Sequence, residues 1–256
     1  GGNSANAQRG NAKLIQDQYV ADLQNLVGGQ GPRGRFVHLY INGLYWGVYN
    51  MHERPDDSFA ESYLGGDKDD YDVIKHTATT VVSGDTTAAA NYAAMLNLVR
   101  QDMTSHFHYT AAIQKIDVDD LINYMLVNYY VGNTDWAHHN WYATYNRVDP
   151  DGKWRFHSWD AELVLRNPGE NAILTGNYTG SPEEVHSRLM ANQEYRLRFA
   201  DLVQKQLDEA RRYGISTFFM DLSHGQARRQ YVRDDGKANG LYAIPHQEVR
   251  TFDDML

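Results

Sequence analysis

Cysteine is missing from this chain of 256 residues, and its absence excludes several kinds of chemistry. Without thiols the chain has no disulfide, no thiolate nucleophile and no zinc site built on cysteine. Long apolar runs are missing as well, because no stretch reaches the roughly 18 consecutive apolar residues that a membrane-spanning helix needs. We therefore expect no membrane span. Neither absence fixes the compartment in which the protein works.

An excess of basic residues is also missing. Lys and Arg number 24 against 33 Asp and Glu, which gives a net charge of −9. This balance argues against general nucleic-acid binding and against docking on anionic membranes. The hydrophobic content of 42% and the mean hydropathy of −0.63 are typical of a globular protein with a polar surface. Since the chain begins Gly-Gly-Asn-Ser, with neither Met nor an apolar leader, we expect a mature fragment or a domain of a longer protein.

Two aspartates and one asparagine form the most informative pattern in the chain. Asp135 is followed five residues later by Asn140, and an isolated Asp160 follows the next two predicted strands. This order of an acid, an amide, a hairpin and a second acid is typical of a kinase catalytic core. In such a core the first acid accepts the proton of the substrate hydroxyl, and the other two groups hold magnesium against the nucleotide phosphates.

The segments around these residues have clear local signals. Residues 118–131 have apolar side chains at helical spacing, and residues 141–146 and 153–159 are typical of strands. The sequence Asp-Pro-Asp-Gly at 149–152 predicts the turn between the strands. Because a hairpin brings its two ends together, we expect the two aspartates to be neighbours in space.

Nearby histidines and a second group of acids have other interpretations. His138, His139 and His157 flank the predicted site, and histidine is a common zinc ligand. Adjacent histidines normally point in different directions, so we interpret these three as polar groups that line a cleft. Four aspartates between positions 67 and 72 have a spacing similar to that of calcium ligands. They lack the glycine and terminal glutamate of an EF-hand, so we interpret them as a solvated turn.

The Asn-Gly pair at 42–43 predicts a β-hairpin, because it separates two aromatic-rich runs at 35–41 and 44–51. We expect the Tyr and Trp side chains of residues 40–49 to pack in the core and across the two strands.

The order of the elements predicts an α+β fold with two lobes and a cleft between them. Residues 1–105 would form a β-rich lobe with some helices, and residues 106–256 a mostly helical lobe that includes the second hairpin. Within the second lobe we expect a long loop at 166–181, helices in 182–212 and another helix within 216–235.

The motifs together resemble the CotH family, which is named for spore coat protein H. Residues 40–55, YINGLYWGVYNMHERP, are similar to the family signature YxNGxYxGxYxxxE. The groups Asn133–Asp135 with Asn140, and Trp159–Asp160, resemble the second and third motifs. Residues 65–75, GGDKDDYDVIK, look like the connecting segment of bacterial members. The resemblance covers roughly residues 30–165.

This resemblance implies an atypical protein-kinase-like fold and ATP-dependent phosphorylation of protein Ser or Thr. Asp135 resembles the catalytic aspartate, and Asn140 and Asp160 resemble the residues that hold Mg²⁺, or in its place Mn²⁺. Lys75 would contact the α- and β-phosphates of ATP, with Glu53 as its ion-pair partner. The implied partner is a protein rich in Ser or Thr. The family also favours an exported location at a cell surface or coat, whereas the oligomeric state stays open.

The chain departs from ordinary protein kinases in several motifs. It has no G-x-G-x-x-G loop, no His-Arg before Asp135, and Ala-Glu instead of Phe-Gly after Asp160. Glu53 precedes Lys75 in the chain, whereas in ordinary kinases the acid follows the lysine. Two alternatives therefore remain beside the kinase. One is a non-catalytic surface-binding module that keeps the fold, and the other is a hydrolase that uses the two aspartates as a carboxylate pair.

Overall fold

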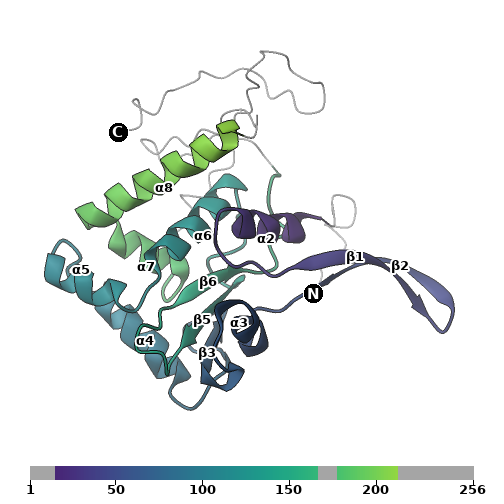
Figure 1. Ribbon diagram of the computed structural model, residues 1–256, viewed down its shortest axis with the longest axis horizontal. Coiled ribbons are helices and arrows are strands. Elements are labelled where there is room, and N and C mark those ends of the chain that lie inside the picture. The colour runs from purple at the N-terminus through teal and green to yellow at the C-terminus, as the bar shows by residue number, and fades with distance from the viewer. Residues whose placement is uncertain (1–14, 167–177, 213–256) are drawn as a thin grey trace.

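The computed structural model describes residues 15–166 and 178–212, in which helices and short strands are mixed along the chain (Figure 1). The elements, in chain order, are α2 (Gln16–Leu26), β1 (Gly34–Ile41), β2 (Leu44–His52), α3 (Asp57–Leu64), η1 (Lys68–Asp70), β3 (Tyr71–Lys75), β4 (Val81–Ser83), α4 (Ala88–Val99), α5 (His106–Ile113), α6 (Val118–Tyr130), β5 (Trp141–Asn146), β6 (Arg155–Ser158), α7 (Pro182–Leu189) and α8 (Gln193–Arg212). The helix expected within 216–235 and most of the loop expected at 166–181 lie outside the described residues. No helix of the described residues is long and apolar enough to cross a membrane.

The α+β class is confirmed, since helices accompany two small antiparallel sheets. One sheet is the hairpin β1–β2. The other has four strands in the order β4-β3-β5-β6. This second sheet combines strands from both sides of residue 105, where we placed the boundary between the lobes. The kinase-like division into two lobes therefore stays a prediction.

Strand β5 and helix α6 form the centre of the molecule, and both agree with the predicted segments. Five of the six residues of β5 are buried, because β3 and β6 pair with its two edges. Helix α6 begins with a cap in which the Asp117 carboxylate accepts a hydrogen bond from the Asp120 N–H at 3.1 Å. It ends before Gly132, whose φ of +56° suits glycine. The buried Trp136, Trp141 and Trp154 belong to the main core, where Trp136 packs on Tyr124 of α6 and the other two pack on Tyr92 of α4.

No strand of the described residues pairs with the outer edge of β6, and two buried side chains satisfy its backbone instead. The amide of Gln24 on α2 donates to the Phe156 carbonyl at 2.6 Å and accepts from the Ser158 N–H at 2.8 Å. The Asp120 carboxylate on α6 accepts from the Phe156 N–H at 2.8 Å. Burial raises the pKa of Asp120 to about 7. Side chains of α2 and α6 thus take the place of a neighbouring strand in hydrogen bonding to β6. Both helices lie beside the sheet in Figure 1.

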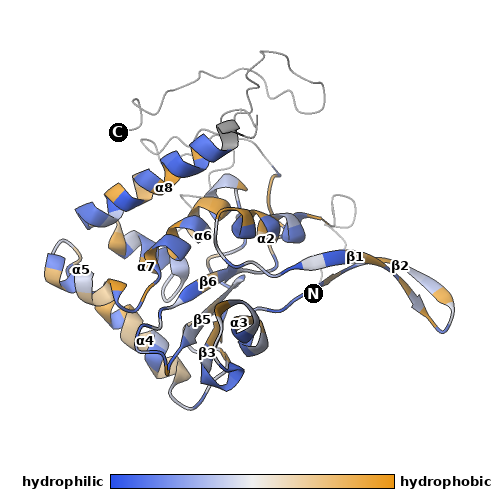
Figure 2. Cartoon of the chain, viewed as in Figure 1, coloured by the Kyte–Doolittle hydropathy of each residue, from blue (hydrophilic) through white to orange (hydrophobic). Residues whose placement is uncertain are grey.

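The hairpin predicted at 35–51 is present, but its aromatic residues are not in the core. Asn42 and Gly43 have φ of +51° and +80°, as a two-residue turn of the I′ type requires. The hairpin extends away from the body (Figure 1), and apolar residues lie along it (Figure 2). Tyr40 is 61% exposed and Trp46 58%. Cross-strand packing occurs between the rings of Tyr40 and Tyr45, 5.2 Å apart. The expected core position was wrong, because no described element packs closely on either face of the ribbon.

The aspartates at 67–72 do not all belong to a solvated turn. Asp67 caps the short helix η1 by accepting from the Asp69 N–H. Asp72, in contrast, is fully buried in β3, where it accepts from Asn91 at 2.6 Å and lies 3.5 Å from Arg147. The solvated interpretation was therefore wrong for Asp72, because β3 is an inner strand of the sheet.

The turn at 149–152 is also present, with the Gly152 N–H donating to the Asp149 carbonyl at 2.9 Å. Glycine is required there for space. A Cβ atom at position 152 would lie 2.1 Å from the carbonyl oxygen of Asn146.

We predict that Gln24→Ala lowers the free energy of unfolding by about 2–4 kcal/mol. The substitution leaves a buried C=O and a buried N–H of β6 without partners, and each such loss costs roughly 1–3 kcal/mol. Urea denaturation followed by circular dichroism measures this difference. Gln101→Ala is the matched control, because Gln101 is exposed and its side chain donates to the Asn97 carbonyl one turn earlier in the chain. The control should change stability by less than about 0.5 kcal/mol. Equal losses in both variants would contradict the role of Gln24.

Candidate active site

The segment between α6 and β5 is an ordered turn that fixes the backbone of Asp135. Asn133 is buried, and its amide donates to the side chain of Asn128 on α6 at 2.9 Å. The Asn133 carbonyl oxygen Oδ1 in turn accepts from the Asp135 N–H at 3.1 Å. Further along, the Asn140 N–H donates to the Trp136 carbonyl at 2.9 Å, which closes a helical turn. The position of Asp135 is thus set from the end of α6.

Asn140 brings the three predicted site residues together. Its amide nitrogen Nδ2 donates to the backbone carbonyl of Asp135 at 2.7 Å and to that of Asp160 at 3.3 Å. These two acceptors fix the orientation of the amide, because a flipped amide would place an oxygen against two carbonyl oxygens. The oxygen Oδ1 of Asn140 is buried and has no hydrogen-bond partner among the described residues. A buried acceptor without a partner is costly, so this oxygen is suited to a ligand or ion.

Asp160 lies directly after β6 in a conformation that is uncommon for a residue other than glycine, with φ of +52°. The N–H of Ala161 donates to the Asp17 carboxylate of α2 at 2.8 Å, which fixes the chain at this point. The Asp160 side chain is solvent accessible. Partial desolvation by the surrounding protein still raises the pKa of Asp160, and the negative charges of Asp17 and Asp135 raise it further. Lys75 and His139 oppose this increase.

Lys75 lies close to this group at the end of β3. In the sheet register Lys75 pairs with Tyr142 of β5. Its ammonium nitrogen is 5.1 Å from the ring centroid of Tyr142 and 5.2 Å from that of Trp159. Burial and the positive charge of Arg54 lower the pKa of Lys75, whereas Asp160 raises it. The structure therefore brings Lys75 into electrostatic contact with one of the two predicted metal ligands.

Glu53 has other partners. Its carboxylate accepts from the Tyr63 hydroxyl at 2.6 Å and from the Arg33 N–H at 2.9 Å. Among the described residues no ion pair joins Glu53 to Lys75. The sequence alone did not reveal these partners of Glu53. Glu53 directly follows β2 of the projecting hairpin, whereas Lys75 lies in the four-stranded sheet.

The three histidines occupy two different environments. His157 is fully buried in β6, where its ring bonds to Thr144 at 2.8 Å and to the Gln30 carbonyl at 2.7 Å, so it is a core residue and our interpretation of it was wrong. His138 and His139, in contrast, both direct Nε2 toward Asp135, at 3.2 and 3.5 Å from its Oδ1. Their positions at i+3 and i+4 from Asp135 are the signal that the sequence contained, because such residues share one face of a helical turn.

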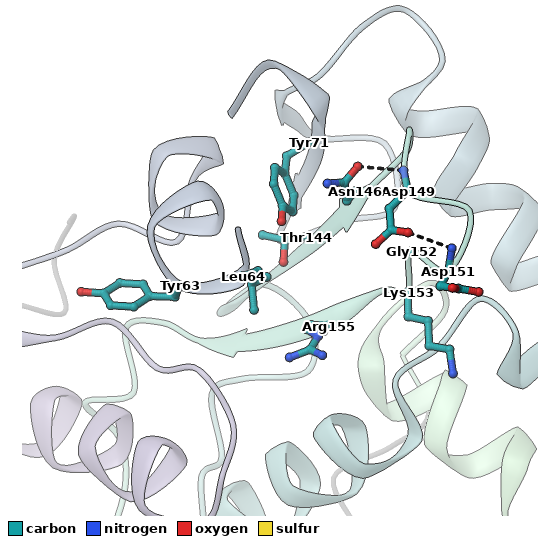
Figure 3. Close-up of a pocket in the computed structure, with 10 residues that line it drawn as sticks. All are labelled: Tyr63, Leu64, Tyr71, Thr144, Asn146, Asp149, Asp151, Gly152, Lys153 and Arg155. Atoms are coloured by element: carbon teal, nitrogen blue, oxygen red, sulfur yellow. Dashed lines mark hydrogen bonds between the residues drawn. The ribbon is translucent and has the colours of Figure 1, made fainter. Parts of the chain in front are cut away.

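A pocket of about 280 Å³ lies away from these residues (Figure 3). Its lining includes Tyr71, Asn146, Gly152 and Arg155. In the register of the sheet, Trp141 pairs with Ser158 at the end near Asp160, and Thr144 pairs with Arg155 at the pocket end. The pocket is therefore at the opposite end of the β5–β6 pair from the candidate site.

Comparison with protein families gives one match. The model of the family described as CotH kinase protein matches residues 6–212. None of the curated proteins matches the chain.

We predict that Asp17→Asn lowers the pKa of Asp160 without returning it to the ordinary value. Asparagine keeps an acceptor for the Ala161 N–H but removes one of the two negative charges, while burial, the larger cause, remains. The pKa is measured from the pH dependence of the Asp160 carboxyl ¹³C chemical shift. Asp22→Asn on the same helix is the control, since Asp22 is exposed and accepts from Gln18. An unchanged Asp160 titration in Asp17→Asn would contradict the electrostatic coupling.

Proposed function

Because the chain belongs to the CotH kinase family, we propose that it transfers the γ-phosphoryl group of ATP to Ser or Thr hydroxyls of a protein substrate, with Mg²⁺ as the metal. The observation that supports this most directly is the arrangement around Asn140. One amide bonds to the backbone of both Asp135 and Asp160, and its own oxygen is left without a partner.

The residues fit a magnesium ion by the chemistry of their donors. Mg²⁺ prefers oxygen ligands, usually one or two protein groups together with water and substrate phosphates. In our proposal the ion is held by Oδ1 of Asn140 and the carboxylate of Asp160. When bound, Mg²⁺ neutralises negative charge on the phosphates. The unpartnered buried oxygen supports this assignment, because an ion would supply the interaction that Oδ1 lacks.

Asp135 is proposed to position the substrate hydroxyl and to accept its proton. The hydroxyl oxygen forms a bond to the γ-phosphorus, the bond from that phosphorus to the β–γ bridging oxygen breaks, and ADP leaves. The proton passes to the Asp135 carboxylate. A backbone fixed by both Asn133 and Asn140 supports this role, because orientation of the acceptor is a large part of such catalysis.

Lys75 is proposed to contact the nucleotide phosphates. Its position near Asp160 and its partial burial support this, because a desolvated ammonium attracts phosphate more strongly than a fully hydrated one. For Glu53, an ion pair with Lys75 would require it to leave Tyr63 and Arg33, so its role in ATP binding stays a prediction.

A non-catalytic binding module is the second candidate function. The exposed aromatic residues of β1–β2 favour it, since large apolar side chains gathered on a surface commonly mark an interaction site. A carboxylate-pair hydrolase would need a substrate groove beside Asp135 and Asp160, and the pocket of Figure 3 lies at the far end of the strands.

If the chain is a kinase, two substitutions should have different effects on ATP binding and on phosphoryl transfer. Asp135→Ala should leave affinity for Mg²⁺–ATP nearly unchanged and lower phosphoryl transfer by about 10²–10⁴-fold, or roughly 3–5 kcal/mol, because this group contacts the hydroxyl rather than the nucleotide. Asp160→Ala should lose both binding and transfer, because the metal loses a ligand. Calorimetric titration measures binding, and incorporation of radiolabelled phosphate into a Ser-rich peptide or the protein itself measures transfer.

Asp201→Ala is the matched control, because Asp201 is an exposed residue on α8. It should change neither quantity. If the wild-type chain binds no ATP with Mg²⁺ or Mn²⁺, the kinase proposal fails. Equal, mild losses in Asp135→Ala and Asp160→Ala would favour the binding module.

A further inference from the structure

The turn that precedes β5 gathers two imidazoles around one carboxylate. One ligand atom from each of Asp135, His138 and His139 lies within 4.8 Å of the other two. Nε2 of His138 is 3.2 Å from Oδ1 of Asp135, and Nε2 of His139 is 3.5 Å from the same oxygen. The proposed kinase chemistry uses only the carboxylate, so both imidazoles are unexplained by it.

The two separations from the Asp135 oxygen match those between the ligands of a tetrahedral ion. Ligand atoms at about 2.0–2.2 Å around a tetrahedral Zn²⁺ lie roughly 3.3–3.6 Å from one another. The two nitrogen–oxygen distances of 3.2 and 3.5 Å are close to this range. The cluster can therefore accept an ion with only small side-chain movements, and the backbone of the turn is already held by Asn133 and Asn140.

The surroundings and exposure of the cluster also suit a metal. His76 lies beside it, with its ring centroid 6.1 Å from that of His139. Nδ1 of His76 is buried, and no group among the described residues hydrogen-bonds to it. The His138 and His139 side chains are 39% and 41% exposed, so an ion can enter from solvent.

We propose that Asp135, His138 and His139 form a binding site for one Zn²⁺ ion, separate from the Mg²⁺ ligands Asn140 and Asp160. Two imidazoles and one carboxylate are a donor set typical of zinc with an open fourth position for water. Magnesium prefers oxygen ligands alone, so the two sites differ in their choice of metal.

A zinc ion at this site inhibits phosphoryl transfer, because it occupies the carboxylate that accepts the hydroxyl proton. This consequence rests on the proposed function, whereas the zinc site itself does not. Zinc would then act as a reversible inhibitor that competes with the substrate hydroxyl for the Asp135 carboxylate rather than with ATP.

Zinc affinity of the full chain is measured first, without ATP, by competition with a chromogenic zinc chelator. The wild type should bind one Zn²⁺ per chain, and a millimolar excess of Mg²⁺ should not displace it. His138→Asn and His139→Asn should each weaken binding by at least the roughly 10- to 100-fold that loss of an outer-shell partner costs. His108→Asn is the control, since His108 is a partly exposed residue of α5 that contacts the Asp102 carbonyl. It should bind zinc as the wild type does.

Zinc-edge X-ray absorption of the wild type tests the ligands without any substitution and should show two imidazoles. Binding that is equally strong in His138→Asn, His139→Asn and His108→Asn, or a spectrum without imidazole, overturns the site. Where the chain transfers phosphate, zinc should lower the rate of the wild type far more than that of His139→Asn, with Mg²⁺–ATP in excess. Zinc binding without this inhibition overturns the inhibitory role. Absence of ATP binding with zinc binding intact refutes the kinase proposal alone.

Discussion

The candidate site depends on how the backbone groups along the outer edge of β6 find hydrogen-bond partners. A strand with a neighbour on only one side leaves a row of N–H and C=O groups that must find other partners when helices cover it. Gln24 and Asp120 provide them from two different helices. The same helix α2 then holds the chain beyond the strand, where Asp17 accepts from Ala161 and the Gln16 amide donates to the Val164 carbonyl. The position of Asp160 therefore follows from contacts made by α2.

A second constraint couples the turn before β5 to the end of β6. The Asn140 amide can donate to two carbonyls only if Asp135 and Asp160 keep their relative positions. The coupling acts on the backbone carbonyls of Asp135 and Asp160, so it does not occupy either carboxylate. The turn therefore combines rigidity of the main chain with accessible side chains, which is the arrangement that catalytic and metal-binding groups need.

Local signals were sufficient for the elements that hold the site. Strand β5 and helix α6 are where periodicity placed them, since their caps, turns and apolar spacing are encoded within a few residues. The contacts that position Asp160 could not be predicted in this way. Gln24 and Phe156 are 132 positions apart, and a buried glutamine has no sequence pattern that distinguishes it from an exposed one.

The exposure of side chains was predicted least well, because it also depends on contacts between residues far apart in the sequence. The aromatic residues of β1–β2 have the composition of a core strand, but composition does not reveal whether another layer covers them. Asp72 is the opposite case, because its acidic neighbours suggested solvent while β3 places it inside the sheet. The interpretation of His157 as a cleft-lining residue was wrong, and the convergence of His138 and His139 on Asp135 was not predicted, because both depend on backbone geometry.

The distance along the chain between Gln24 and its partner has a consequence for the newly made protein. A ribosome adds roughly 5–20 residues per second, so the 132 positions between α2 and Phe156 correspond to roughly 7–26 seconds of synthesis. The hairpin β1–β2 can close within about 1–10 microseconds of its emergence. Gln24 of α2, in contrast, can form its hydrogen bonds only after β6 has been made. The contacts that position Asp160 therefore form long after the hairpin has closed, although α2 is made before the hairpin.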